Sequence, residues 1–471
     1  MNARGPQRRR WALGCVALAV CLGCSSDEGS ADAPQGAIVI LLDTLRADHV
    51  SAYGYERQTT PRIDRLAQGG VRFAQVVSPA PWTLPATGAL LAGDDPGRVF
   101  GADNRLQYSL VEEFAAQGIA TAAFTEGAFV SRHFGFDRGF DTFHEEEGAV
   151  VATLEPGQAP EPGAGDIART FGEAQKWLRR HRNERFLLLI HTYEPHTPYT
   201  TPAFTEGLDS GRVGERYDSK RFAGLRTGEL ELSEDERAWA TALYDGDILR
   251  ADRFVGKLIA FLRELDLDER TVVVVAGDHG EELGEHFDRF LFDHGHSLHD
   301  ELLMVPLIVR DPTREDAGAV VEQQVRLIDT LPTVADLLGV ELPDDLLGES
   351  LVPLMDGEPG RDRAAISSLT RYGPPRVSLR DGRFKFIRTI GADKGDPVRL
   401  EPTVPDVALY DLIEDPGETR NVADEHEALV TRLNEVLDAW AATLTAGSGE
   451  LDTSTMDPEL LDRLRALGYL K

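Results

Sequence analysis

Cysteine is scarce in this chain of 471 residues: there are three, and all lie within the first 24 positions. The remainder can form no disulfide, so any metal site there must use carboxylate, imidazole or hydroxyl ligands. Basic residues are also few, with 49 Lys and Arg against 80 Asp and Glu and a formal net charge of −31. This balance argues against nucleic acid as a partner, because phosphate backbones need surfaces rich in Lys and Arg.

The N-terminus has the pattern of an export signal. Arg8 to Arg10 supply a basic region, and Trp11 to Leu22 supply an apolar run that is short for a membrane span. The sequence around Cys24 resembles a bacterial lipoprotein cleavage site, although Cys21 stands where Leu, Val or Ile is usual.

We therefore expect residues 1–24 to be a lipoprotein-type signal peptide and residues 25–36 a tether. The protein is then exported and held at the bacterial envelope membrane by a lipid on Cys24. A secreted or periplasmic soluble protein and an uncleaved anchor are the alternatives.

Three apolar segments each end in Asp or His, and their residues run without polar alternation. They are residues 37–42 before Asp43, residues 186–190 before His191, and residues 271–276 before Gly277, Asp278 and His279. Such runs are typical of buried strands in an α/β sheet, at whose carboxyl ends ligands gather. A polar surface cap could explain one such ending, whereas three together indicate a site.

Amphipathic patterns predict helices over residues 110–117 and 245–265. Residues 147–165 and 200–235 are rich in Gly, Pro and charge, which predicts surface insertions or a substrate lid.

The pattern changes near residue 361, where short strands between 376 and 390 precede a helix near 425–444. We expect a catalytic domain over 37–360, a C-terminal subdomain over 361–446, and a tail with a short helix over 447–471.

The segment around Thr83 resembles the nucleophile segment of the sulfatase family, in which Cys or Ser, x, Pro, x, Arg precedes a run of small residues. Here Thr83 holds the nucleophile position and Thr87 the arginine position. Sulfatases convert the Cys or Ser to formylglycine, and threonine is not a substrate for that conversion. A threonine hydroxyl can still attack sulfur or phosphorus when a metal or a base activates it.

Two further motifs resemble the metal-binding segments of sulfatases and related phosphohydrolases: the one that opens at Asp43 and the one that contains Asp278 and His279. The resemblance implies one divalent cation held by Asp43, Asp278, His279 and the Thr83 oxygen. Oxygen and imidazole ligands can hold such an ion without cysteine. The family favours Ca²⁺, and Mn²⁺, Mg²⁺ or Zn²⁺ would also be compatible.

The likeness extends from about Ala37 to the C-terminus, with matching segments at residues 134–141 and 409–421. It implies an α/β fold, an alkaline-phosphatase-like sandwich on a large mixed sheet with a smaller C-terminal α+β subdomain.

Histidines are the candidates for proton transfer. His196 matches the family histidine that protonates the leaving group, and a pKa near neutrality suits that task. His191 is a weaker candidate for substrate binding, and a structural role is as compatible. Either His294 or His296 is expected to meet the transferred group; we give His296 the catalytic role and His294 a binding role, and the sequence leaves the choice open.

Two other residues are candidates for substrate binding. Arg46 could supply the bidentate anion contact that Thr87 does not, or form a salt bridge at a strand end. Asn104 matches a family position near the substrate oxygens, although a turn would explain it nearly as well. A lysine-containing segment of the family has no counterpart here, since residues 121–126 carry Glu126 instead.

These observations predict a metal-dependent hydrolase that cleaves sulfate, phosphate or phosphonate esters through Thr83. Its partner would be an anionic ester, such as a glycan or a lipid headgroup. Two alternatives stay open: a transferase that passes a phospho-headgroup to envelope lipid or glycan, and a protein that binds anions without turnover.

Overall fold

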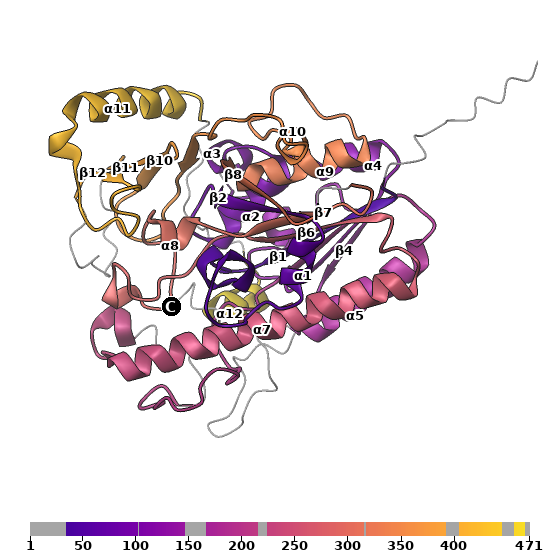
Figure 1. Ribbon diagram of the computed structural model, residues 1–471, viewed down its shortest axis with the longest axis horizontal. Coiled ribbons are helices and arrows are strands. Elements are labelled where there is room, and N and C mark those ends of the chain that lie inside the picture. Colours follow the sequence, from indigo (N-terminus) through magenta and orange to yellow (C-terminus); the bar gives the residue numbers. More distant parts are fainter. Residues whose placement is uncertain are drawn as a thin grey trace, which may run out of the picture. The chain divides into compact units, whose positions relative to one another are not determined.

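The computed structural model (Figure 1) describes residues 34–101, 103–146, 166–214, 224–314, 317–391, 405–444 and 456–466. The predicted signal peptide, Cys24, nearly all of the tether and the insertion at 147–165 lie outside these residues. Within the described ranges, no helix has the length and apolarity needed to cross a membrane.

An eight-stranded mixed sheet carries the predicted strands at its centre. Its order is β4 (Thr142–Glu145), β3 (Ala120–Thr125), β5 (Phe186–Thr192), β1 (Gly36–Leu42), β6 (Thr271–Gly277), β7 (Leu307–Arg310), β2 (Val71–Val77) and β8 (Ala319–Arg326). Strand β1 pairs in parallel with both β5 and β6, and β7 runs antiparallel to its neighbours β6 and β2. The expected α/β fold on a large mixed sheet is confirmed.

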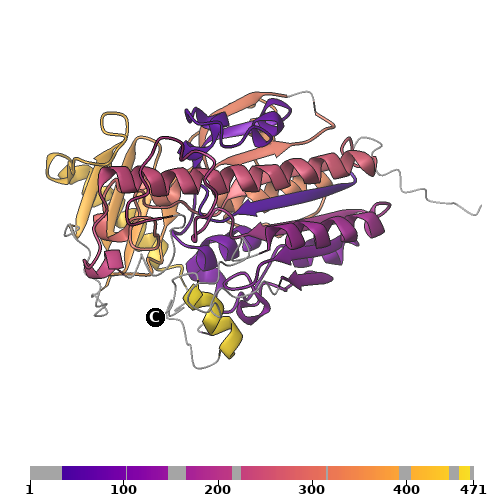
Figure 2. The ribbon, with the colours of Figure 1, turned by 90° about the horizontal axis from the view of Figure 1, so that it is seen from below.

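Helices cover both faces of this sheet, which explains why its central strands are apolar throughout. Ala37, Val39 and Leu41 of β1 enter one core, and the alternate residues of the strand enter the other. The first core is closed by α2 (Thr83–Ala92), α3 (Pro96–Val99), α4 (Val111–Ala116), α9 (Thr330–Leu338) and α10 (Val352–Met355). The second is closed by α1 (Ile63–Gln68), α5 (Ile167–His181) and α7 (Glu234–Glu264), with α5 and α7 side by side (Figure 2).

The C-terminal subdomain contains a four-stranded antiparallel sheet, in the order β12 (Val407–Asp411), β11 (Phe384–Thr389), β10 (Arg376–Arg380) and β9 (Ala365–Ser367). Helix α11 (Glu427–Ala441) packs on this sheet through Leu433 and Leu437. The short helices α8 (Asp300–Leu303) and α12 (Pro458–Ala466) complete the described α-helices. The strands and the helix expected in this part of the chain are confirmed.

Candidate active site

The central strands bring three predicted site residues to one edge of the sheet. Leu42 pairs with Thr192 on one side and with Gly277 on the other. Asp43, His191 and Asp278 therefore meet, and one ligand atom of each lies within 4.8 Å of the others. All three side chains are fully buried.

Thr83 is the first residue of α2, and its hydroxyl points into the same group. Thr83 Oγ1 donates to Asp43 Oδ2 at 3.0 Å and lies 3.3 Å from His279 Nε2. The helix can begin there because Trp82 is fully extended, and the approach is fixed by Ser78, whose hydroxyl donates to the Asp278 carbonyl at 2.6 Å. The predicted nucleophile and predicted metal ligands are thus neighbours.

Hydrogen bonds orient the ligands around one point. His279 Nδ1 donates to the Gly280 carbonyl at 2.9 Å, so in the neutral ring Nε2 keeps its lone pair toward Asp43 and Thr83. Asp278 Oδ1 accepts from the backbone N–H groups of Thr44 and His279, at 3.1 and 2.8 Å. These contacts leave Asp278 Oδ2 without a donor among the described residues.

The residues present fit a divalent cation. Among the described residues, none donates a hydrogen bond to Asp43 Oδ1, Asp278 Oδ2 or His191 Nδ1, although all three atoms are buried. Burial, followed by the charge of Asp43, raises the pKa of Asp278 to about 6. Two buried carboxylates side by side are costly unless a cation neutralises them, and oxygen and imidazole atoms suit such an ion. His191 joins the group that the motifs implied.

A row of imidazole rings leads from this group to His196. The His294 ring centroid lies 4.5 Å from that of His279 and 5.0 Å from that of His196. His196 follows β5 in a segment whose Glu194–Pro195 and Thr197–Pro198 peptide bonds are cis. Its Nδ1 donates to the Thr197 carbonyl at 2.8 Å, so in the neutral ring the lone pair is on Nε2. Burial lowers the pKa of His196, and the charge of Asp43 opposes that shift.

The structure separates His294 from His296. His294 Nδ1 lies 2.9 Å from Glu281 Oε1, and the other oxygen of Glu281 accepts a hydrogen bond from Tyr199 at 2.7 Å. His296 instead stacks on Phe290 at 4.3 Å, with Nε2 3.6 Å from Glu282. Gly295, at φ 83°, lies between the two histidines, and their rings contact different neighbours. The catalytic role of His296 stays a prediction.

Arg46 binds carboxylates of this chain, and its part in substrate binding stays a prediction. Its guanidinium binds Asp48 through Nε and Nη2, at 2.9 and 2.6 Å, and reaches Glu285 through Nη1 at 2.7 Å. The salt bridge at a strand end, the alternative that the sequence left open, is what the structure shows. Asn104 closes a turn at φ 57° by donating its N–H to the Gly101 carbonyl, and its part in substrate binding stays a prediction.

Two residues near the site hold neighbouring segments in position, and the sequence did not predict this role for either. Glu126 accepts hydrogen bonds from Thr192 Oγ1 and the Tyr193 N–H, at 2.8 and 2.9 Å, and so fixes the chain beside His191. Arg371 reaches across from the C-terminal subdomain, with its guanidinium 5.0 Å from the Trp82 ring and its backbone N–H 2.7 Å from the Gly295 carbonyl. No sequence signal links Arg371 to Thr83.

Comparison with known families decides the classification. A family model described as Sulfatase matches residues 35–340. The chain belongs to the sulfatase family. A second model, described as N-sulphoglucosamine sulphohydrolase, C-terminal, matches residues 284–442. Members of this family hydrolyse esters and generally depend on a metal, and the buried carboxylates of the present site agree with that.

Individual relatives are distant but extend over most of the chain. Steryl-sulfatase of Mus musculus is 25% identical and covers 90% of this chain and 83% of its own. N-acetylglucosamine-6-O-sulfatase of Bacteroides thetaiotaomicron is 23% identical and covers 88% and 87%.

Two solved structures share the fold. The phosphonate monoester hydrolase of Agrobacterium radiobacter has a TM-score of 0.67 at 21% identity and covers 87% of this chain and 95% of its own. BT4656 in complex with D-glucosamine-2-N,6-O-disulfate has a TM-score of 0.66 at 21% identity, with 87% and 99% covered.

Proposed function

We propose that this sulfatase-family protein hydrolyses sulfate, phosphate or phosphonate esters with Thr83 as a covalent nucleophile and with the help of one divalent cation. The observation that carries the proposal is the position of Thr83 Oγ1, 3.0 Å from Asp43 and 3.3 Å from His279 in a fully buried group. A threonine that served only to begin a helix would not need these partners.

Asp43, Asp278, His279 and the Thr83 oxygen would hold the cation, with His191 at their side. When bound, a divalent cation there would lower the pKa of the Thr83 hydroxyl and offset negative charge on the transferred group. The supporting evidence is the pair of buried carboxylate oxygens without a donor among the described residues.

The chain's own residues then divide the reaction between them. The Thr83 hydroxyl gives its proton to Asp43 Oδ2, and Oγ1 bonds to sulfur or phosphorus as the bond to the leaving oxygen breaks. His196 Nε2 donates a proton to that oxygen, and an anionic ester beside it would raise the lowered pKa of this histidine. Water then attacks sulfur or phosphorus of the Thr83 ester and gives a proton to His196 Nε2. The bond to Oγ1 breaks, Asp43 returns its proton to Oγ1, and the sulfate, phosphate or phosphonate leaves.

The nucleophile bears on the choice of substrate. A phosphorylated threonine can be hydrolysed by attack at phosphorus, whereas a sulfated threonine lacks the elimination route that formylglycine offers. This chemistry favours phosphate or phosphonate esters, while the names of the relatives favour sulfate esters of glycans and sterols. The proposal therefore covers an anionic ester on a glycan or a lipid headgroup.

A turnover panel tests the activity. Aryl sulfate, phosphate monoester, phosphate diester and phosphonate substrates are each assayed with Ca²⁺, Mg²⁺, Mn²⁺ and Zn²⁺ added to metal-free protein. We expect metal-dependent hydrolysis of at least one substrate. Absence of turnover with every combination would contradict the proposal and favour a protein that only binds anions.

Export and lipid anchoring at Cys24 form a separate proposal, which rests on the residues around that cysteine. Labelling of producing cells with a radioactive fatty acid should mark the wild-type protein and miss Cys24→Ser. Labelling that persists in the variant would exclude Cys24 as the lipidated residue.

A further inference from the structure

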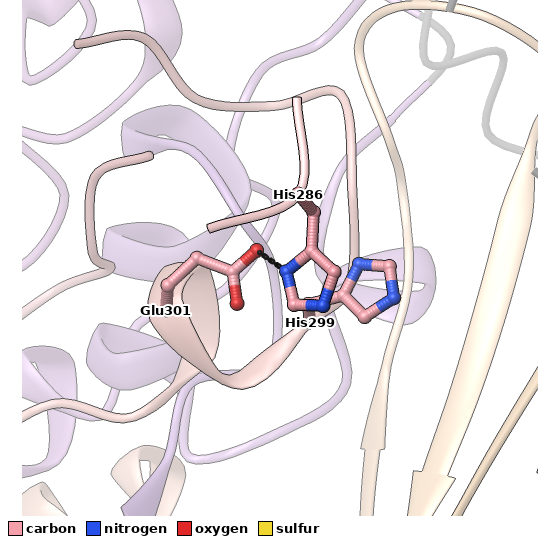
Figure 3. Close-up of side chains that lie close together, drawn as sticks. All are labelled: His286, His299 and Glu301. Atoms are coloured by element: carbon pink, nitrogen blue, oxygen red, sulfur yellow. Dashed lines mark hydrogen bonds and ion pairs between the residues drawn. The ribbon is translucent and has the colours of Figure 1, made fainter. Parts of the chain in front are cut away.

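A second group of metal-ligating side chains lies outside the Asp43 site. His286, His299 and Glu301 each offer one ligand atom, and these atoms lie within 4.8 Å of one another (Figure 3). We propose that this group binds a second divalent cation of the zinc class, independently of the catalytic site.

The contact between His286 and Glu301 requires a positive charge. His286 Nε2 lies 3.3 Å from the Glu418 carbonyl, which can only accept, so Nε2 carries a proton. In the neutral ring the lone pair of Nδ1 then points at Glu301 Oε1, 2.9 Å away, and two acceptors face each other (Figure 3). A proton or a metal ion must lie between them.

The distances allow a metal ion after small shifts. Zinc binds imidazole nitrogen and carboxylate oxygen at about 2.0–2.2 Å, so two ligands at a tetrahedral angle lie roughly 3.3 Å apart. The 2.9 Å between His286 Nδ1 and Glu301 Oε1 is the distance of a hydrogen bond, and it would have to widen by about 0.4 Å for both atoms to bind one ion. The His299 ring stacks on that of His286 with centroids 4.0 Å apart, and it would have to rotate to turn a nitrogen toward the ion. Two nitrogens and one oxygen suit Zn²⁺ or Co²⁺ better than Ca²⁺.

His286 and His299 each have further hydrogen-bond partners beside them. His299 Nδ1 lies 2.5 Å from Ser297 Oγ, and its Nε2 lies 3.3 Å from the Tyr410 hydroxyl. In the present rotamer both ring nitrogens of His299 therefore face hydroxyls, and His286 donates to the Glu418 carbonyl. Metal-bound histidines are usually oriented by such second hydrogen bonds.

An acidic cavity borders the proposed ligands. It has a volume of about 420 Å³, and its walls include His286, Glu301 and four further carboxylates, those of Asp48, Glu285, Asp300 and Glu418. Each of these four carboxylates has a cationic partner: Arg46 binds Asp48 and Glu285, Lys385 binds Asp300 and Glu418, and Arg380 also binds Asp300. With Glu301, the five carboxylates still outnumber these three cations. Such a wall concentrates divalent cations at the ligands.

The site would also connect two parts of the chain. His286 and Glu301 belong to the segment after β6, whereas Tyr410 and the Glu418 carbonyl belong to the C-terminal subdomain. Because the ion would bind only the folded arrangement, it should stabilise the contact between them.

The test uses the full chain with its catalytic ligands disabled by Asp43→Asn and Asp278→Asn. Metal-free protein is titrated with Co²⁺ and Zn²⁺, with stoichiometry read from bound metal and the Co²⁺ environment from visible absorption. We expect one equivalent and a higher melting temperature with Zn²⁺. Adding Glu301→Gln should weaken binding at least about 10-fold, since removing a ligand costs no less than removing an outer partner.

Glu435→Gln, at an exposed position of α11, is the matched control and should change nothing. His299→Phe keeps an aromatic ring but removes a ligand, so it replaces Glu301→Gln if circular dichroism shows that variant unfolded. The proposal is overturned if the Asp43→Asn, Asp278→Asn protein binds no Co²⁺, or if loss of Glu301 or His299 leaves the affinity unchanged.

Discussion

The two carboxylate oxygens of Asp278 have different surroundings. Backbone N–H groups hold Oδ1, while Oδ2 lies buried without a donor among the described residues. The side chain therefore contributes to the site more than to the stability of the core.

We predict that Asp278→Ala lowers the bound metal by one equivalent per chain. Compared without metal, its melting temperature should be nearly equal to that of the wild type or higher. The variant removes a ligand and also the repulsion between two buried carboxylates. Metal analysis of the purified variant measures the bound metal, and calorimetry measures its melting temperature. An unchanged metal content would remove Asp278 from the ligand set.

Thr83 carries the second residue-scale prediction. Thr83→Ala should lose activity by several orders of magnitude, because only binding and electrostatics would remain. Thr83→Ser keeps the oxygen and deletes one methyl group, so it should retain measurable turnover and is the control. Steady-state rates of the three proteins are compared on whichever ester the wild type hydrolyses. Equal rates for Thr83→Ala and wild type would refute the mechanism.

Motifs could predict which residues gather but not where each side chain points. Asp43, Asp278 and His279 follow strands whose apolar runs predict their neighbourhood, and the structure places them together. The choice between His294 and His296 depends on the turn at Gly295 and on contacts with Glu281 and Glu282, which no sequence spacing reveals.

Among the elements, apolar strands were the easiest to predict and charged helix ends the hardest. Helix α7 was expected from residue 245 but begins at Glu234, after a capping box between Ser233 and Glu236. Its first turns carry mostly charged side chains, so the amphipathic pattern is weak there, and the cap rather than the apolar face defines the start.

Two glycines in helices should respond in opposite ways to replacement by alanine. A Cβ at Gly246 in α7 would lie 1.8 Å from the Thr201 carbonyl oxygen, whereas a Cβ at Gly172 in α5 would meet nothing within 4 Å. Gly246→Ala should lower the free energy of unfolding by about 1–3 kcal/mol through overpacking. Gly172→Ala should raise it by roughly 0.5–1 kcal/mol through better helix propensity.

Urea unfolding of both variants measures these changes. Stabilisation by Gly246→Ala would mean that α7 does not approach Thr201 as closely as the structure shows.

At the scale of the whole molecule, buried polar contacts join the C-terminal subdomain to the large sheet. Lys385 is fully buried and binds Asp300 at 2.7 Å and Glu418 at 3.0 Å. The Trp440 indole of α11 donates to Asp95 at 2.8 Å. These partners are far apart in the sequence, so only the three-dimensional structure reveals them.

Asp95 gives this junction a pH dependence. Burial raises the pKa of Asp95 to about 6 from an ordinary value of 3.8, so the folded state favours its protonated form. The resulting stability is fully present below pH 3.8 and is lost as the pH rises through 6. Relative to Asp95→Asn, the wild type should lose up to about 3 kcal/mol of unfolding free energy between pH 4 and pH 7.

Denaturant unfolding of both proteins across this pH range makes the comparison. Because other groups titrate in both proteins, the difference between the two curves isolates Asp95. A difference that stays constant with pH would contradict the raised pKa.

The most direct test of the whole account is mass spectrometry of the wild-type protein quenched in acid during turnover. A nucleophilic Thr83 predicts a phospho or sulfo adduct on the peptide that contains it, present only with substrate and metal, and formylglycine nowhere in the chain. Rapid turnover with no adduct on Thr83, or with the adduct on another residue, would contradict the account.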